Sequence, residues 1–92
     1  MVEQVNTKQD LPAVQTVRIF PNPASGQLNI ILSEVHPRIG IRVENMKGQT
    51  LIRFEAFRTN KYQLDLHGLE PGWYLLKIDS GNEVITRKFY KY

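Results

Sequence analysis

The chain has 92 residues and no cysteine, which excludes disulfide bonds and thiol chemistry and leaves the redox compartment open. It also lacks any apolar run approaching the roughly 20 residues of a membrane-spanning helix, so we expect no direct membrane insertion. Its two histidines, His36 and His67, lie far apart in the sequence, and carboxylates do not cluster near them. We therefore expect neither a metal site nor a cofactor.

Helical periodicity is missing as well, because no window repeats apolar residues at i, i+3, i+4 and i+7. Without a helix, the glycines cannot form a phosphate-binding loop at a helix start. Short segments of alternating apolar and polar residues recur instead, with turn signals every eight to twelve residues or so. This pattern predicts an all-β, immunoglobulin-like antiparallel β-sandwich of about seven strands. The expected strands are residues 17–20, 27–32, 39–45, 50–57, 61–66, 73–79 and 83–91.

Two turns stand out between these strands. Pro21-Asn22-Pro23-Ala24-Ser25-Gly26 interrupts any helix or ladder because proline has no amide donor, and Gly26 can take a left-handed conformation before the next strand begins. Asn45-Met46-Lys47-Gly48 reads as a hairpin turn with Gly48 at the position that needs a positive φ.

A third turn, Pro71-Gly72, comes directly before the most regular strand pattern. Pro71 presets φ, Gly72 accepts a positive φ, and Tyr74 follows at the spacing of a tyrosine corner, in which the hydroxyl bonds back to the turn. An ordinary turn followed by a half-buried tyrosine fits these residues equally well.

Composition is that of one globular domain, with 41% hydrophobic and 23% charged residues. Residues 1–16 are polar and aperiodic and are expected to be a linker; residues 17–92 are the domain. Met1-Val2-Glu3-Gln4 does not resemble an export signal, and we interpret the chain as a fragment of a larger protein. The net charge of +3 is spread along the strands and alternates with acids, so nucleic-acid binding is not expected.

Catalytic chemistry has only weak candidates. Asp65 and His67 are two residues apart on one strand face, and Ser25 or Ser33 would have to approach them. No nucleophile elbow or oxyanion loop accompanies them, so we do not expect an enzyme.

Four blocks of the sequence, in this order, resemble the C-terminal sorting domain carried by cargo of the Bacteroidetes type IX (Por) secretion system. They are IFPNPASGQLNI at 19–30, VENMKGQ at 43–49, LDL, GL and PGWYLLKI within 64–78, and KFYK at 88–91. The resemblance spans residues 17–92. Trp73 departs from it, since smaller or variable residues are common there.

The resemblance implies a signal at the end of a larger exported protein, in transit through the periplasm to the outer-membrane surface or the extracellular space. The outer-membrane translocon would recognise the folded domain. A sortase-like protease would typically cut upstream of Val17 and join the cargo to anionic lipopolysaccharide, although some relatives stay uncut.

By the same resemblance, the basic end of the chain would be the recognition segment, comprising Arg87, Lys88, Phe89, Tyr90, Lys91 and Tyr92. The motif positions with structural roles would be Pro21, Asn22, Pro23, Gly26, Gly48, Pro71, Gly72 and Tyr74. Two alternatives stay open: Phe89 fills the core while Tyr90 caps a sheet face, and the basic residues form a solvated edge that resists aggregation.

A different class of function also stays open, namely a fibronectin type III-like adhesive module that binds carbohydrate or protein. It predicts an exposed aromatic platform or an acidic metal loop away from the C-terminus, and the sequence shows neither clearly. Self-association is compatible with either function.

Overall fold

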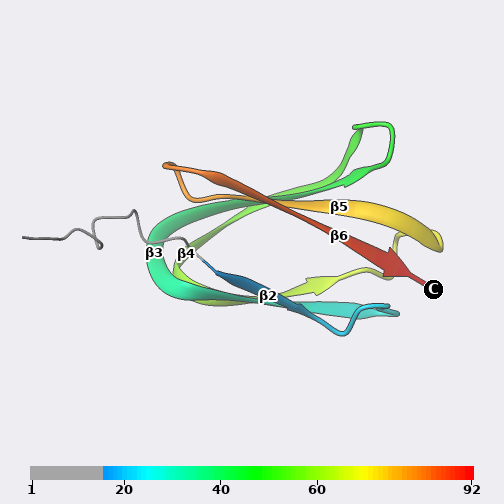
Figure 1. The fold of residues 1–92 in the computed structure, drawn as a ribbon, viewed down its shortest axis with the longest axis horizontal. Helices are drawn as coiled ribbons and strands as arrows, with labels where there is room; N and C mark the ends of the chain where they lie inside the picture. Colours follow the sequence, from blue (N-terminus) through cyan, green and yellow to red (C-terminus); the bar gives the residue numbers. More distant parts are fainter. Residues whose placement is uncertain (1–15) are drawn as a thin grey trace, which may run out of the picture.

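The computed structural model describes residues 16–92, and within them every regular element is a β-strand (Figure 1). The strands are β2 (Val17–Phe20), β3 (Gln27–Asn45), β4 (Thr50–Asp65), β5 (Gly72–Asp79) and β6 (Val84–Lys91). All strand pairs are antiparallel. The predicted all-β antiparallel class is therefore confirmed. Of the predicted linker, residues 1–15 lie outside the described residues.

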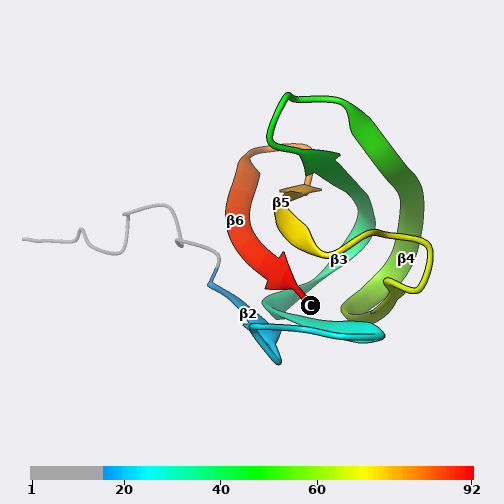
Figure 2. The same cartoon turned by 90° about the vertical axis from the view of Figure 1, so that its right-hand side faces the viewer.

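β3 organises the sheet because it pairs on both edges. β4 runs along one edge of β3; β2 pairs with the start of the other edge and β5 with its end, and β6 lies beyond β5. The sheet is bent, so that its two halves face each other across the interior (Figures 1 and 2).

The predicted strand count of seven is wrong, because residues 16–92 form five strands in a single sheet. Residues 27–32 and 39–45 belong to one strand, β3, and residues 50–57 and 61–65 belong to one strand, β4. The segment 33–38, predicted as a loop, continues β3 through the bend. Two separate packed sheets are not seen; the same sheet supplies both layers.

The bend shows why the local sequence was misleading. The pairing of β3 with β4 is interrupted after Ile31 and Lys61 and resumes at His36 and Thr59. Between these two pairs β3 has four residues and β4 has one. β3 accordingly runs around the outside of the bend (Figure 1). On the inner strand, Arg58 takes a left-handed φ of 53°, which turns β4 sharply. The polar, proline-containing stretch of β3 looks like a loop but is held as a strand by its neighbour.

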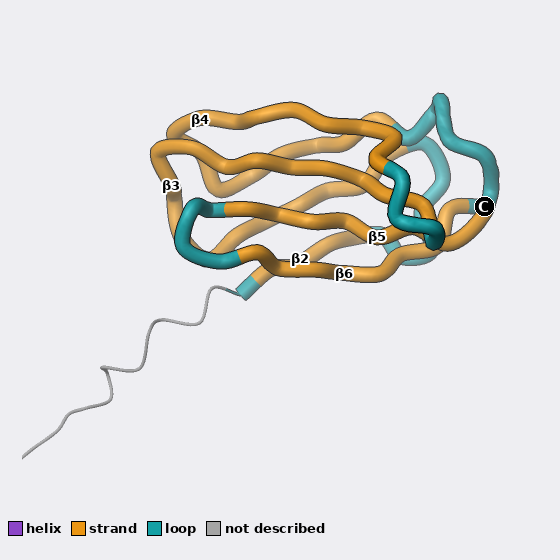
Figure 3. The backbone as a smooth tube through the Cα atoms, turned by 90° about the horizontal axis from the view of Figure 1, so that it is seen from above, coloured by secondary structure: helices purple, strands orange, loops and turns teal. Residues whose placement is uncertain are grey.

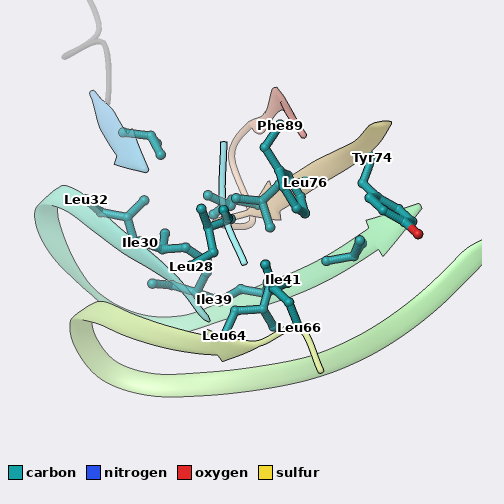
Figure 4. Packing of buried hydrophobic residues seen from close by; sticks show 14 residues of the cluster. Leu28, Ile30, Leu32, Ile39, Ile41, Leu64, Leu66, Tyr74, Leu76 and Phe89 are labelled. Atoms are coloured by element: carbon teal, nitrogen blue, oxygen red, sulfur yellow. The ribbon is translucent and has the colours of Figure 1, made fainter. Parts of the chain in front are cut away.

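The core lies between the two halves of the bent sheet (Figure 4). Tyr74, Leu76 and Ile78 form the inward face of β5, and all three are buried. Other fully buried side chains come from β3, from just beyond the end of β4, and from β6. They are Leu28, Ile30, Ile39, Ile41, Val43, Leu66 and Phe89.

The β3–β4 hairpin matches its prediction. The Gly48 amide donates to the Asn45 carbonyl at 3.0 Å, and the Asn45 amide donates to the Gln49 carbonyl at 3.0 Å. Gly48 has a φ of 87°, a conformation that side chains with a Cβ resist. The Asn45 side chain accepts two further amides of the turn, which fixes its shape.

Candidate functional site: the carboxyl-terminal strand

β6 is an edge strand that is anchored by one core side chain. It pairs along β5, with Phe89 opposite Tyr74. Phe89 has no exposed surface, and its ring stacks on that of Tyr74 with centroids 5.8 Å apart. Of the two sequence interpretations of Phe89, the structure favours the core one. Its neighbours on the strand, Lys88 and Tyr90, belong to the opposite face of the sheet.

The proline-rich turn holds the other edge of β6. The Ala24 amide donates to the Tyr90 carbonyl at 2.8 Å, and the Tyr92 amide donates to the Ala24 carbonyl at 2.9 Å. The Asn22 side chain adds two bonds, accepting the Tyr90 amide at 3.1 Å and donating to the Lys88 carbonyl at 3.4 Å. We call residues 22–24 the clasp. It joins the first motif of the sequence to the last strand.

The tyrosine corner is present. The Tyr74 hydroxyl donates a hydrogen bond to the carbonyl of Glu70, four residues back, and the tyrosine is buried. Gly72 has a φ of 153° and pairs with Lys91. The turn that begins β5 is thereby connected to β6, at Phe89 and at the end of the strand.

The outer face of β5 and β6 carries an aromatic and basic cluster. Trp73 is 50% exposed and meets Tyr90 edge to face at 5.1 Å. The Lys88 ammonium lies 4.6 Å from the centroid of the Trp73 ring, within cation–π range. No acid among residues 16–92 forms an ion pair with Lys88. This end of the sheet therefore presents uncompensated positive charge beside aromatic surface.

Toward the centre of the sheet, Glu44 neutralises the positive charge of the same face, and its side chain is 9% exposed. Arg42 Nε lies 2.9 Å and Lys77 Nζ 3.3 Å from its carboxylate oxygens. The hydrogen bond from Arg42 lowers the pKa of Glu44, with help from Lys77, and this outweighs the opposing effect of burial. The cations in the middle of the face, Arg42 and Lys77, are thus paired with a carboxylate, unlike Lys88 of β6.

Gly26 does not use the left-handed conformation that is open to glycine, because its φ is not positive. The imidazole of His67 covers it so closely that a Cβ would lie 2.7 Å from Nε2. The Gly26 carbonyl also accepts the Leu66 amide at 2.9 Å. Because residue 26 has no side chain, the backbone passes directly beneath the ring of His67.

The weak catalytic candidates do not assemble. His67 Nδ1 lies 2.7 Å from Asp65 Oδ1, but both side chains are more than 70% exposed. The His67 backbone amide also bonds this carboxylate and is the main reason that the pKa of Asp65 is lowered. No hydrogen bond joins Ser25 to His67 within the described structure, and residues 16–92 contain no cluster of metal-ligating side chains. Nor is any helix there long and apolar enough to cross a membrane.

The predicted site residues thus fall into two connected groups and one separate turn. Pro21, Asn22 and Pro23 lie in or beside the clasp, against the predicted recognition segment 87–92. Pro71, Gly72 and Tyr74 form the corner beneath it, whereas Gly48 belongs to the hairpin. The sequence did not reveal the contact of Ala24 with β6, because the amide and carbonyl that make it carry no side-chain signal. The sequence hinted at this contact only through Asn22, a side chain that can both donate and accept, between two prolines that have no backbone amide donor.

The chain was also compared with models of known protein families. A family model described as the secretion system C-terminal sorting domain matches residues 18–91. The chain belongs to the type IX secretion C-terminal sorting domain family. A comparison with curated proteins returns no match.

As a type IX sorting domain, the chain is a sorting signal that interacts with the type IX secretion machinery. The protein that carries it is secreted to the cell surface or beyond. The family is not known to be catalytic.

Proposed function

We propose that the outer-membrane translocon reads this domain as a folded address by contacting the exposed side of β6. The observation that carries the proposal is the way in which the terminal strand is held. The clasp and the corner fix the strand at the sheet edge, while the side chains of Lys88, Tyr90 and Tyr92 remain accessible to different degrees. Tyr92 is 65% exposed, at the very end of the sheet (Figure 1).

Within the recognition segment the residues have different tasks in this proposal. Phe89 is sealed in the core, so it positions the strand rather than touching the partner. Lys88 and Tyr90 present the cation and the aromatic ring that meet Trp73. Tryptophan and tyrosine are enriched among the hot spots of protein interfaces, and an exposed cation can steer an acidic partner. Arg87 and Lys91 are half-buried and would contribute charge at the margin.

Processing would then take place outside the folded domain. A sortase-like protease would cut in the linker ahead of Val17 and transfer the cargo to anionic lipopolysaccharide, after transit through the periplasm. β2 begins at Val17 and is paired with β3, so a cut upstream of it leaves the sheet whole. The domain itself would perform no reaction.

A reporter fusion tests the proposal. An inert periplasmic protein is joined to residues 1–92 and produced with an inner-membrane export signal in a host that has the type IX system. We expect reporter at the surface or in the medium, shortened by the mass of the domain and carrying lipopolysaccharide. The reporter without the domain is the control and should stay periplasmic. A fusion that stays periplasmic and uncut, or one that instead binds glycans on an array, would overturn the proposal.

A further inference from the structure

The first half of β4 is an open sheet edge. β4 pairs with β3 on one side, and within residues 16–92 no strand pairs with its other side. Figure 2 shows this strand on the outside of the fold, and Figure 3 shows it as the outermost strand seen from above. An open edge of this length is a template for pairing with another strand, and proteins usually protect such edges.

The backbone groups on this edge can be assigned from the alternation of antiparallel ladders. The clasp binds the amide and carbonyl of Tyr90, so Phe89 directs its own groups toward β5. The same alternation continues from β6 through β5 and β3 to β4. At the pair formed by Ile41 and Phe54, it directs the backbone amide and carbonyl of Phe54 toward β3. The amides and carbonyls of Arg53 and Glu55 therefore point outward and are unpaired by β3.

These two residues carry charges that the fold leaves incompletely matched. Arg53 lies directly across the ladder from Arg42 and forms no ion pair within residues 16–92, while Arg42 is bound by Glu44. The Glu55 carboxylate accepts both guanidinium bonds of Arg38 through Oε2 alone. Like charges opposite one another destabilise a ladder. A cation without a partner and a carboxylate with a free oxygen thus stand two residues apart on the open edge.

Only one symmetric register uses both charges. In an antiparallel pair of identical strands, one residue faces its own copy, and outward-pointing residues must face one another. Centring the pair on Arg53 or on Glu55 would place like charges together. Centring it on Ile52 would place Arg53 opposite Leu51 and Glu55 opposite Gln49. Centring it on Ala56 would place Glu55 opposite Phe57 and Arg53 opposite Thr59, so neither register pairs opposite charges. Centring it on Phe54 places Arg53 opposite Glu55 of the second copy, twice by symmetry.

We propose that two copies of this chain pair antiparallel through the open edges of β4, with Phe54 facing its own copy. Arg53 and Glu55 then exchange backbone hydrogen bonds and their side chains form two intermolecular ion pairs. The register also brings Phe57, which is 60% exposed, level with the exposed Leu51 of the second copy. β4 and β6 lie on opposite sides of the fold (Figure 2), so the proposed translocon surface stays accessible in the dimer.

Charge exchange tests the pairing. Sedimentation equilibrium of the 92-residue chain from about 1 µM to 1 mM should show a monomer–dimer equilibrium. Arg53→Glu or Glu55→Arg alone should raise the dissociation constant about tenfold or more, since each places like charges opposite one another. The double variant should return it to within about threefold of the original, because the pair is restored in reverse. A monomer at every concentration, or a double variant no better than the single ones, would overturn the proposal.

Disulfide trapping tests the register in a chain that has no cysteine of its own. Oxidised Phe54→Cys should give a covalent dimer, because each new thiol faces its own copy across the pair. The matched control is Ala56→Cys, which would face residue 52 of the second copy and should stay monomeric. Thermal unfolding of both reduced variants verifies that they fold. Trapping of the control instead of Phe54→Cys, or of neither variant, would contradict the register.

Discussion

The backbone amide of Ala24 donates a hydrogen bond to the carbonyl of Tyr90 at 2.8 Å, and the end of this domain depends on that contact. The Asn22 side chain supplies a second link, because its oxygen accepts a hydrogen bond from the backbone amide of Tyr90. Strand β6 is consequently held on both edges near its end, by β5 and by the clasp. A motif near the start of the domain thus determines how its last residues are presented.

Replacing Asn22 with alanine should loosen this end of the strand. The change removes the acceptor of the Tyr90 amide and the donor to the Lys88 carbonyl. We expect the free energy of unfolding to fall by about 1–2 kcal/mol and the Tyr90 amide to exchange faster with solvent. Denaturant titration and amide exchange measure both. Asn82→Ala, in the exposed turn before β6, is the control and should change neither.

Removing the corner hydroxyl should have a smaller and more local effect. Tyr74→Phe keeps the buried ring against Phe89 but loses the bond to the Glu70 carbonyl. A loss of about 1 kcal/mol is expected in thermal or denaturant unfolding. Tyr92→Phe, which changes an exposed hydroxyl, provides the comparison. Equal stability of the two variants would show that the corner bond contributes nothing.

The close approach of His67 to Gly26 predicts coupling between them. Gly26→Ala should cost about 1 kcal/mol because the new methyl group meets the imidazole and displaces it from Asp65. In a His67→Ala background the same change should cost little, since the obstacle is gone. A double-mutant cycle of unfolding free energies measures the difference. Purely additive effects would place the cost in the backbone instead.

Acid should destabilise the fold through Glu44. Its pKa is lowered in the folded state by the hydrogen bond from Arg42, so the stabilisation is fully present above its ordinary pKa of about 4.3. It is lost as the pH falls further, through the lower folded-state value. Unfolding measured between pH 7 and pH 2.5 should therefore show a shallower acid loss in Glu44→Gln than in the original chain. Glu83→Gln, exposed at the last turn, should keep the original slope.

Local alternation predicted the strands whose environment is uniform along their length. β2 was expected at 17–20 and β5 at 73–79, and the structure has Val17–Phe20 and Gly72–Asp79. The corner at Tyr74 and the hairpin at Gly48 were also readable, because each depends on residues only a few positions apart. In these segments local preference and tertiary packing agree.

Prediction failed where distant segments decide the conformation. Residues 33–38 are polar and contain Pro37, yet they stay extended because β4 follows β3 around the bend. A left-handed conformation was open to Gly26, whereas the structure shows the ring of His67, distant in the sequence, where a Cβ of residue 26 would lie. The clasp was not foreseen because its main bonds join backbone groups of residues at opposite ends of the domain.

The most direct test is export of a reporter carrying a domain whose fold is intact but whose terminal surface is changed. Lys88→Glu with Tyr92→Ser alters the exposed side of the last strand without touching buried Phe89, and Lys61→Glu makes the same charge change on β4. With melting temperatures matched, we expect the double variant to lower surface reporter about tenfold or more and Lys61→Glu to leave it unchanged. Normal export of the double variant would contradict reading of the terminal strand.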